Sequence, residues 1–323
     1  MSRLLVVAGK GGVGKTTVTA VMARAAANSG LRVLVVTLDS RTGLAALLGG
    51  DPEAGSDYEG SRIDANLGPK KTGFIHLRTI TAAEALQDYL ATQGMARLAK
   101  RLVSTGVVGI VSSAAPGLDD LLVLGKLKHL VSLTGPDGDY DLIIVDGPAA
   151  GHAISFLQSP AAMAETIRGG PIRSQAIEVQ SMLQDPTRCR VVMVTLPETT
   201  PVNELVESTA LLSDTVGVTF APVVVNGVDS APDISALVEA GDVGDDDLGN
   251  EYLGRAARFR AERCAMHAQA VTRVDSIVQT GHFALPHLAV AGLSSADISI
   301  LADALQEQIG SKRTPRKKVG GGK

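Results

Sequence analysis

Residues Leu4 to Asn28 read LLVVAGKGGVGKTTVTAVMARAAAN, and this stretch decides the fold. Its first five residues form a short apolar run, which is typical of a strand buried on both faces of a parallel sheet. From Lys15 onward, the spacing and the many alanines predict a helix that ends at Ser29-Gly30. A second strand of the same kind follows at Arg32–Thr37, so the segment predicts a βαβ unit with a right-handed crossover.

The loop between this strand and helix fits the phosphate-binding pattern G-x-x-x-x-G-K-[ST]. Its glycines allow backbone N–H groups to turn inward around phosphate oxygens, and the helix N-terminus adds partial positive charge. We expect Lys15 to reach the β- and γ-phosphates and the Thr16 hydroxyl to bind Mg²⁺. The loop therefore predicts a nucleotide-binding protein, and the residues expected to hold the nucleotide are Gly9, Gly11, Gly12, Val13, Gly14, Lys15, Thr16 and Thr17.

Strands and helices alternate along the rest of the chain. This alternation predicts an α/β fold with a mainly parallel sheet and helices on both faces, and the phosphate-binding loop makes it a P-loop NTPase fold. Further strands are expected at Gly73–Thr79, Leu142–Val145, Arg190–Thr195, Phe220–Val225 and Leu285–Val290. Further helices are expected at Ala82–Gln93, Leu118–Leu133, Ile154–Arg168, Ser174–Gln184, Val202–Asp214, Asn250–Thr280 and Ala296–Ile309.

The domain organisation follows from where the motifs fall. We expect one P-loop NTPase domain over residues 1–310, because the motifs that make up the nucleotide site are spread through it. Residues 49–71 are rich in Gly, Asp, Pro and Ser and predict a long loop or insertion. Residues 311–323, SKRTPRKKVGGGK, are too polar to pack and predict a basic disordered tail.

Composition excludes several classes of protein. The chain has 323 residues, 3% aromatic, with two cysteines. Two cysteines cannot form a disulfide framework or a four-ligand zinc site, which indicates a reducing cytosol. The chain has no run of about 18 apolar residues and no secretory signal, so we expect a cytoplasmic protein without a transmembrane segment. So few aromatic residues make a stacking platform for single-stranded nucleic acid improbable.

Charge is divided unevenly along the chain. The last 13 residues hold six basic and no acidic side chains, whereas the other 310 hold 24 basic and 34 acidic ones. An acidic body is unsuited to DNA, so no DNA partner is expected. The basic tail could make peripheral contact with anionic lipid, at about 1 kcal/mol per basic residue.

A second lysine in the phosphate loop, Lys10, gives the pattern K-G-G-V-G-K-T. This pattern resembles the deviant Walker A motif of the dimeric P-loop ATPases that include MinD, ParA, the nitrogenase iron protein and ArsA. In that family the first lysine reaches across the dimer to the partner's nucleotide. The resemblance therefore implies that Lys10 acts in trans, as an arginine finger does, and that the chain pairs with itself or with a paralogue.

Asp39 ends the second strand and opens the stretch DSRTGLAALLG. A carboxylate at the carboxyl end of a strand can orient or deprotonate an attacking water. The stretch resembles the first switch, D-P-A-x-N-L-x-x-x-F-G, of the ArsA and guided-entry ATPases, which implies that Asp39 activates the water. Ser40 and Arg41 depart from the Pro-Ala of that pattern.

Asp146 follows the apolar run LIIV at the end of another strand, a Walker B position that would support Mg²⁺. It opens DGPAAGH, which resembles the second switch D-T-A-P-T-G-H of the same branch. The resemblance implies switch roles for Pro148, Gly151 and His152. Gly147-Pro148 stands where that pattern has Thr-Ala-Pro.

Asn226 ends the run VVVN, which resembles the strand end at which the same family reads adenine with an Asn side chain. The following residues give N-G-V-D, which has the spacing of the guanine-reading N-K-x-D but lacks its lysine. ATP is therefore favoured over GTP. Taken together, the motifs place the chain in the ArsA-like branch, closest to its actinobacterial single-unit members.

The resemblance implies an ATPase that uses Mg²⁺, with Lys10, Lys15 and Asp39 as catalytic residues, and that couples hydrolysis in a dimeric switch to an unknown protein client. Two alternatives stay open: a non-catalytic, nucleotide-gated binding or assembly factor, and a positioning ATPase like ParA or MinD. The specialised parts of the family are poorly represented. Cys264 stands alone in the region of the zinc-binding pair, although His267 could share a metal with it, and two cysteines do not suffice to bind arsenite.

Overall fold

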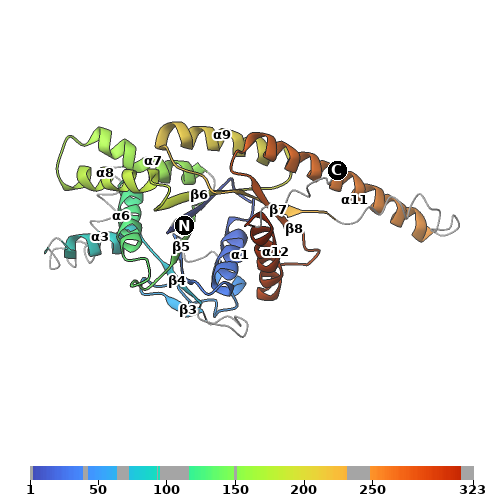
Figure 1. Cartoon of the computed structure of the whole chain (residues 1–323), viewed down its shortest axis with the longest axis horizontal. Coiled ribbons are helices and arrows are strands. Elements are labelled where there is room, and N and C mark those ends of the chain that lie inside the picture. Colours follow the sequence, from blue (N-terminus) through green and yellow to red (C-terminus); the bar gives the residue numbers. More distant parts are fainter. Residues whose placement is uncertain are drawn as a thin grey trace, which may run out of the picture.

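The computed structural model places β1 (Leu4–Ala8) inside an eight-stranded sheet of order β3-β4-β2-β5-β1-β6-β7-β8 (Figure 1). It describes residues 3–38, 43–63, 73–92, 94, 116–148, 151–230 and 248–313. The other strands are β2 (Arg32–Thr37), β3 (Ser61–Ile63), β4 (Phe74–Thr79), β5 (Leu142–Asp146), β6 (Cys189–Thr195), β7 (Val223–Val228) and β8 (His282–Pro286).

Neighbouring strands pair in parallel, apart from β3, which is antiparallel to β4 at one edge. The apolar runs predicted as strands lie in the middle of the sheet, and all five residues of β5 are buried. Strands covered on both faces need no polar alternation, which explains why their sequences are almost continuously apolar. The parallel pairing brings the carboxyl ends of β1, β5, β6 and β7 to one edge.

Helices cover both faces of the sheet. Leu4, Val6 and Ala8 of β1 belong to one core cluster and Val7 to the other, as the alternation of a strand requires. The first face is covered by α3 (Ala82–Thr92), α6 (Leu118–Ser132), α7 (Gly151–Thr166), α8 (Pro171–Gln184) and α9 (Thr199–Val216), with the end of α11 (Leu248–Ile277). The second face is covered by α1 (Lys15–Asn28), α2 (Leu44–Leu47) and α12 (Ser295–Arg313).

Three expectations from the sequence need correction. The segment 49–71, expected as a loop or insertion, contributes β3, whose pairing with β4 supplies partners that a three-residue strand cannot find locally. The last strand is β8, His282–Pro286, rather than Leu285–Val290, because its register follows its pairing with β7. The helix α12 continues to Arg313, into the predicted disordered tail, and residues 314–323 lie outside the described part of the chain.

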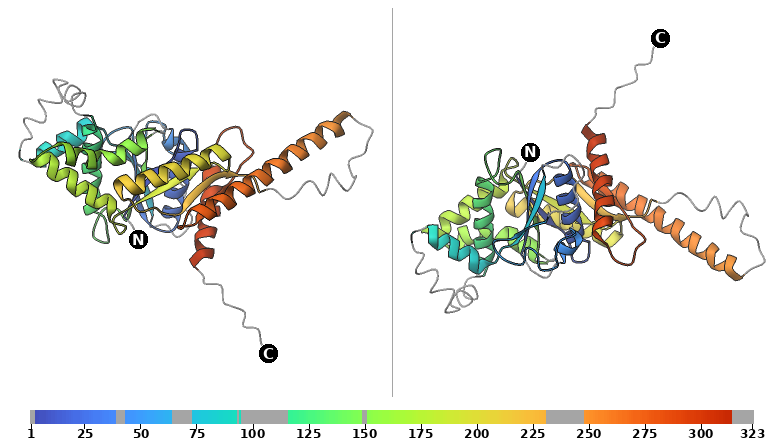
Figure 2. Two further views of the ribbon diagram at one scale, coloured as in Figure 1. Left: turned by 90° about the horizontal axis from the view of Figure 1, so that it is seen from above. Right: turned by 90° about the horizontal axis from the view of Figure 1, so that it is seen from below.

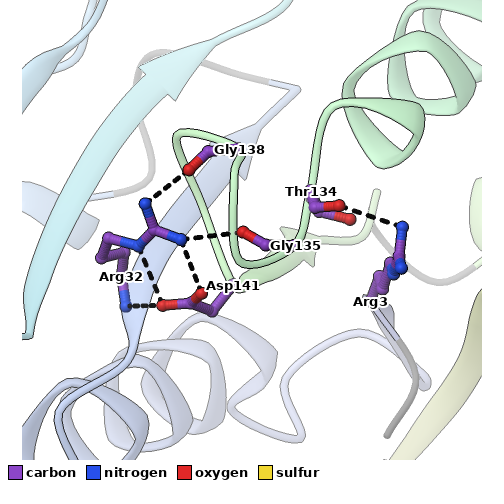
Figure 3. Close-up of polar contacts among 6 residues, drawn as sticks. All are labelled: Arg3, Arg32, Thr134, Gly135, Gly138 and Asp141. Carbon is purple, nitrogen blue, oxygen red and sulfur yellow. Dashed lines mark hydrogen bonds and ion pairs between the residues drawn. The ribbon is translucent and has the colours of Figure 1, made fainter.

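An arginine clamp fixes the edge of the sheet at which the parallel strands begin (Figure 3). Arg32, the first residue of β2, donates to both carboxylate oxygens of Asp141, which precedes β5, at 2.8 and 3.1 Å. Its guanidinium also donates to the carbonyl oxygens of Gly135 (at 2.9 Å) and Gly138. The Arg32 side chain holds the pKa of Asp141 below its usual range. The turn before β5 is thus held to β2 at several atoms.

The helices of the described residues were also compared with the length and apolarity that a membrane span requires. None of them is both long and apolar enough to cross a bilayer.

Candidate functional site

The phosphate loop lies between β1 and α1, where backbone geometry demands glycine. Gly14 directly precedes α1 and has φ of 84°, in the left-handed region. A Cβ atom on Gly14 would lie 2.3 Å from the amide nitrogen of Asn226, and one on Gly9 would lie 2.4 Å from the carbonyl oxygen of Val194. Gly9 and Gly14 are therefore required both by their backbone conformation and by close packing against β6 and β7.

The Lys15 amino group lies inside this loop. Its Nζ donates to the carbonyl oxygens of Gly9 at 3.2 Å and Lys10 at 3.3 Å. Burial lowers the pKa of Lys15, and the carboxylate of Asp146 opposes that change. The lysine is thus directed at the space that the loop encloses, as expected of a phosphate-binding lysine.

The carboxylate of Asp146 is joined to α1 by two hydroxyl groups. Thr16 Oγ1 donates to Oδ2 at 2.8 Å and Thr19 Oγ1 to Oδ1 at 3.2 Å. Asp146 is only 5% exposed, and its burial raises the pKa of the carboxyl against the effects of both threonines and of Lys15. A buried carboxylate beside a Thr hydroxyl offers the hard oxygen donors that Mg²⁺ prefers, so these residues fit a metal that a nucleotide's phosphates would complete.

Asn226 lies against the phosphate loop from the end of β7. Its Nδ2 donates to the carbonyl oxygen of Val13 at 2.9 Å, which joins β7 to the loop across 213 residues of sequence. The expected adenine-reading residue is therefore next to the loop. Asp229, three residues on, is engaged elsewhere: Arg260 of α11 contacts its carboxylate at 3.4 Å.

Lys10 lies on the exposed side of the loop and forms an ion pair with Glu204 of α9. The Lys10 side chain is 55% exposed and that of Glu204 is 24% exposed. Beside them lies a cavity of about 210 Å³, which Glu207 and the α7 residues Ala153 and Ile154 also line. The pair therefore connects the phosphate loop to α9 next to the start of α7.

The segment expected to be the second switch starts with a close backbone contact at Gly147 and leads towards α7. The N–H of Gly147 donates to the Val7 carbonyl oxygen at 3.1 Å, and a Cβ there would lie 2.1 Å from that oxygen. Pro148 is half-buried, residues 149–150 lie outside the described residues, and Gly151 begins α7. His152 is exposed and close enough to Asp120 to oppose the rise in the pKa of that carboxyl, which burial and Asp119 cause.

Other expected residues fall differently. Asp39 lies outside the described residues, so its role stays a prediction. Gly11 and Gly12 form the exposed turn of the loop, and Thr17 lies half-buried in the first turn of α1.

The sequence analysis does not predict two contacts of the site. Thr19 is the second hydroxyl partner of Asp146, and its spacing of three from Thr16 on one helix is a signal that could have found it. The pairing of Glu204 with Lys10 joins residues 194 apart, and no local pattern indicates it.

Cys264 and His267, which the sequence leaves open as a pair of metal ligands, lie in different surroundings. His267 is buried and its Nδ1 accepts from the Asp229 N–H at 2.9 Å, while Cys264 is half-buried. Among the described residues, no group of three or more His, Cys, Asp or Glu side chains could hold a metal ion.

Comparison with known families accounts for this arrangement. A family model described as anion-transporting ATPase, ArsA, matches residues 2–170, which include the phosphate loop and the start of α7. The chain belongs to the ArsA ATPase family. This confirms the resemblance and the α/β P-loop fold that the sequence predicts.

Relatives of the ArsA family extend the similarity. ATPase BagA of Mycobacterium tuberculosis is 33% identical over 211 residues, which cover 64% of this chain and 59% of that protein. The arsenical pump-driving ATPase of Escherichia coli is 28% identical over 204 residues, 62% of this chain and 30% of that protein. ATPase ASNA1 homolog 2 of Paramecium tetraurelia is 29% identical over 161 residues, 48% of this chain and 43% of that protein. The chain thus spans 59% of the mycobacterial relative.

A larger groove lies on the first face of this ArsA-family chain, between α3, α6 and α8, with a volume of about 1230 Å³. Apolar, basic and acidic side chains line it, and two of its lysines, Lys126 and Lys128, form ion pairs with Asp88 and Glu178 of the same lining. The lining side chains include Leu118, Leu121, Leu122, Ile172, Ile177, Lys126, Lys128, His129 and Arg188. Leu121 and other α6 residues also belong to the core cluster, so this apolar helix packs on the sheet and forms part of the groove.

Proposed function

We propose that the protein hydrolyses ATP with Mg²⁺ and works as a dimeric switch that binds or releases a client protein. One observation carries the proposal: Lys15, Thr16, Asp146 and Asn226 come from three separate strand ends and converge on one loop of an ArsA-family chain. The contact of Asp229 with Arg260 supports ATP over GTP, because it engages the carboxylate that a guanine-reading motif needs.

The roles of the residues follow from their placement. Backbone N–H groups of the loop and the Lys15 amino group bind and neutralise the phosphates. Thr16 and Asp146 would hold Mg²⁺, which would neutralise negative charge on the nucleotide's phosphates. Asn226 is proposed to contact the adenine base of the nucleotide. Asp39 is proposed to orient the attacking water, as the family resemblance implies.

Lys10 is proposed to act on the nucleotide of a second copy. In the structure it is held by Glu204, so forming the catalytic dimer requires this exposed ion pair to open. Surface pairs of this kind contribute about 0–1 kcal/mol, so Glu204 can hold Lys10 in place without preventing its release.

The client is proposed to bind on the first face of the sheet. The second switch leads directly into α7, which packs on both α6 and α8. A shift of Asp146 and Pro148 with the state of the nucleotide would move α7 and with it the walls of the groove. The groove's size and its mixed apolar and charged lining suit a peptide segment more than a small ion.

The alternative function is a nucleotide-gated assembly factor that binds ATP without turnover. The experiment that separates the two measures phosphate release and binding of fluorescent ATP for the wild type, Lys15→Ala and Lys10→Ala, with exposed Arg168→Ala as a control. We expect Lys15→Ala to lose binding, and Lys10→Ala to keep binding but lose turnover. Wild-type binding without phosphate release, with or without host lysate, would favour the assembly factor, and Lys10→Ala turnover near the wild-type rate would remove the trans role.

A further inference from the structure

The C-terminal half of helix α11 is packed against the body of the protein. Val274 is fully buried in the first core cluster, and His267 is 5% exposed and accepts the hydrogen bond from the Asp229 N–H. Further along, Thr280 Oγ1 donates to the Ala221 carbonyl oxygen at 3.2 Å. His267 therefore lies beside the end of β7 and Thr280 beside its beginning, so α11 runs antiparallel to β7.

The N-terminal part of α11 extends past the edge of the sheet that carries the nucleotide site. Because His267 is level with the carboxyl end of β7, the nineteen helical residues before it continue beyond that edge. At a rise of about 1.5 Å per residue they span roughly 28 Å. Figures 1 and 2 show this projection, and we call residues 248–266 the arm.

The arm carries the most exposed large apolar side chains among the described residues. Phe259 is 66% exposed and Met266 60% exposed. They stand seven residues apart, two helical turns, and so share one face of the helix. An aromatic and a flexible thioether side chain held out in water are typical of an interface that is incomplete in the isolated chain.

The charge of the arm is opposite to that of the rest of the chain. The arm holds four arginines against two glutamates, whereas the other residues up to 310 hold 20 basic and 32 acidic side chains. The arginines are Arg255, Arg258, Arg260 and Arg263, and Arg260 already contacts the Asp229 carboxylate of the body. Opposite charges favour docking of the arm on another copy of this acidic body.

We propose that the arm docks on a second copy of this chain, with Phe259 and Met266 as its apolar contacts. This inference rests on the proposed dimeric function and adds a surface to it. Two copies that face each other through their nucleotide edges each have an arm that projects alongside the partner, because the arm leaves from that same edge. The arms hold the two copies together on either side of the nucleotides.

The test compares Phe259→Asp/Met266→Asp with Ile300→Asp, a matched control on α12 whose side chain is 55% exposed and lies outside the arm. Sedimentation equilibrium in Mg²⁺ with a slowly hydrolysed ATP analogue gives the dimer Kd, and fluorescence gives nucleotide affinity. We expect the arm variant to dimerise at least about tenfold more weakly, at unchanged nucleotide affinity, and the control to match the wild type. Circular dichroism checks that each variant is folded.

The two proposals fail in different ways. A wild type that stays monomeric, or an arm variant that dimerises as the wild type does, overturns the docking of the arm even if ATP is hydrolysed. A wild type that dimerises through the arm but does not release phosphate overturns the ATPase proposal alone. A further measurement is sedimentation with vesicles of phosphatidylglycerol and phosphatidylcholine. If the wild type binds the vesicles and the arm variant does not, while both dimerise equally, the arm binds a lipid surface and the docking on a second copy is overturned.

Discussion

The phosphate loop and the arm of α11 lie at the same edge of the sheet but are held in opposite ways. Around the loop, Gly9 and Gly14 lack the room for even one more carbon, and Asn226 and Asp146 contact it from other strands. The arm has exposed Phe259 and Met266 and is positioned by contacts near His267, where it joins the body. The loop is preorganised for a small anionic ligand, whereas the arm presents a surface for a large partner.

The largest expected effect is on turnover, and it follows from a change to the buried carboxylate of Asp146 beside the phosphate loop. We expect Asp146→Asn to lower Mg²⁺-dependent turnover by about 100-fold or more, because the loop loses the anion that supports the metal. The measurement is phosphate release across a Mg²⁺ titration, with exposed Asp303→Asn as the control. Turnover within a few-fold of the wild type would mean that Asp146 does not support the metal.

The same substitution has the opposite effect on the protein without ligands. Burial raises the pKa of Asp146, so the folded chain holds its ionised form less favourably than the unfolded chain does. That penalty is present above the ordinary pKa of an aspartate, at pH 7 for example, and the neutral amide removes it. We therefore expect the nucleotide-free Asp146→Asn protein to melt no lower than the wild type at pH 7, in contrast to its loss of turnover.

A second prediction separates conformation from packing within the loop. Gly12 and Gly14 have φ of 81° and 84°, but a Cβ on Gly12 meets nothing within 4 Å whereas one on Gly14 meets Asn226. Both alanine variants lose about 1–2 kcal/mol to the left-handed backbone. We expect the free energy of unfolding of Gly14→Ala to be about 1–3 kcal/mol lower than that of Gly12→Ala, which is the usual range for overpacking.

Adding Asn226→Ala to Gly14→Ala tests the cause of that difference. The double variant removes the amide that the new methyl group meets, so it should recover most of the difference in denaturant titration. Equal stabilities of the two single variants would show that the loop is less tightly packed than the contact with β7 indicates.

The smallest expected effect concerns His267, where the arm joins the body. Burial lowers the pKa of His267 from 6.5, and Arg263 and His287 lower it further. Asp229 and Glu198 act in the opposite direction. The unfolded chain therefore binds the proton more readily, and stability falls as the pH drops through 6.5. Protonated Nδ1 can no longer accept the Asp229 N–H, so acid also loosens the base of the arm.

We expect His267→Gln to remove part of this pH dependence at a cost of about 1 kcal/mol or less, because glutamine still offers an acceptor. Thermal unfolding of His267→Gln and of the exposed control His129→Gln, between pH 5 and 8, provides the measurement. A wild-type pH profile in His267→Gln would remove the role of this imidazole.

The same contrast explains how much the sequence could predict. The strand β1, the helix α1 and the residues of the phosphate loop follow from local rules, because the order of apolar run, Gly-rich loop and helical spacing is contained in one short stretch of sequence. The edge strand β3, the start of β8 and the ion pair of Lys10 with Glu204 depend on partners far along the chain. The sequence predicts the length of α11. It does not predict that the helix projects beyond the sheet, because the projection depends on where His267 meets the end of β7.

The arginine clamp has a consequence for how this protein can change over time. Arg32 and Asp141 hold the sheet where the strands begin, while the loop lies at the edge where they end, five residues further along β2 or about 17 Å. Substitutions at the clamp alter how firmly β2 and the turn before β5 are held together, without reaching the phosphate loop. Thermal tolerance and nucleotide chemistry can therefore evolve separately, one from each end of the same strands.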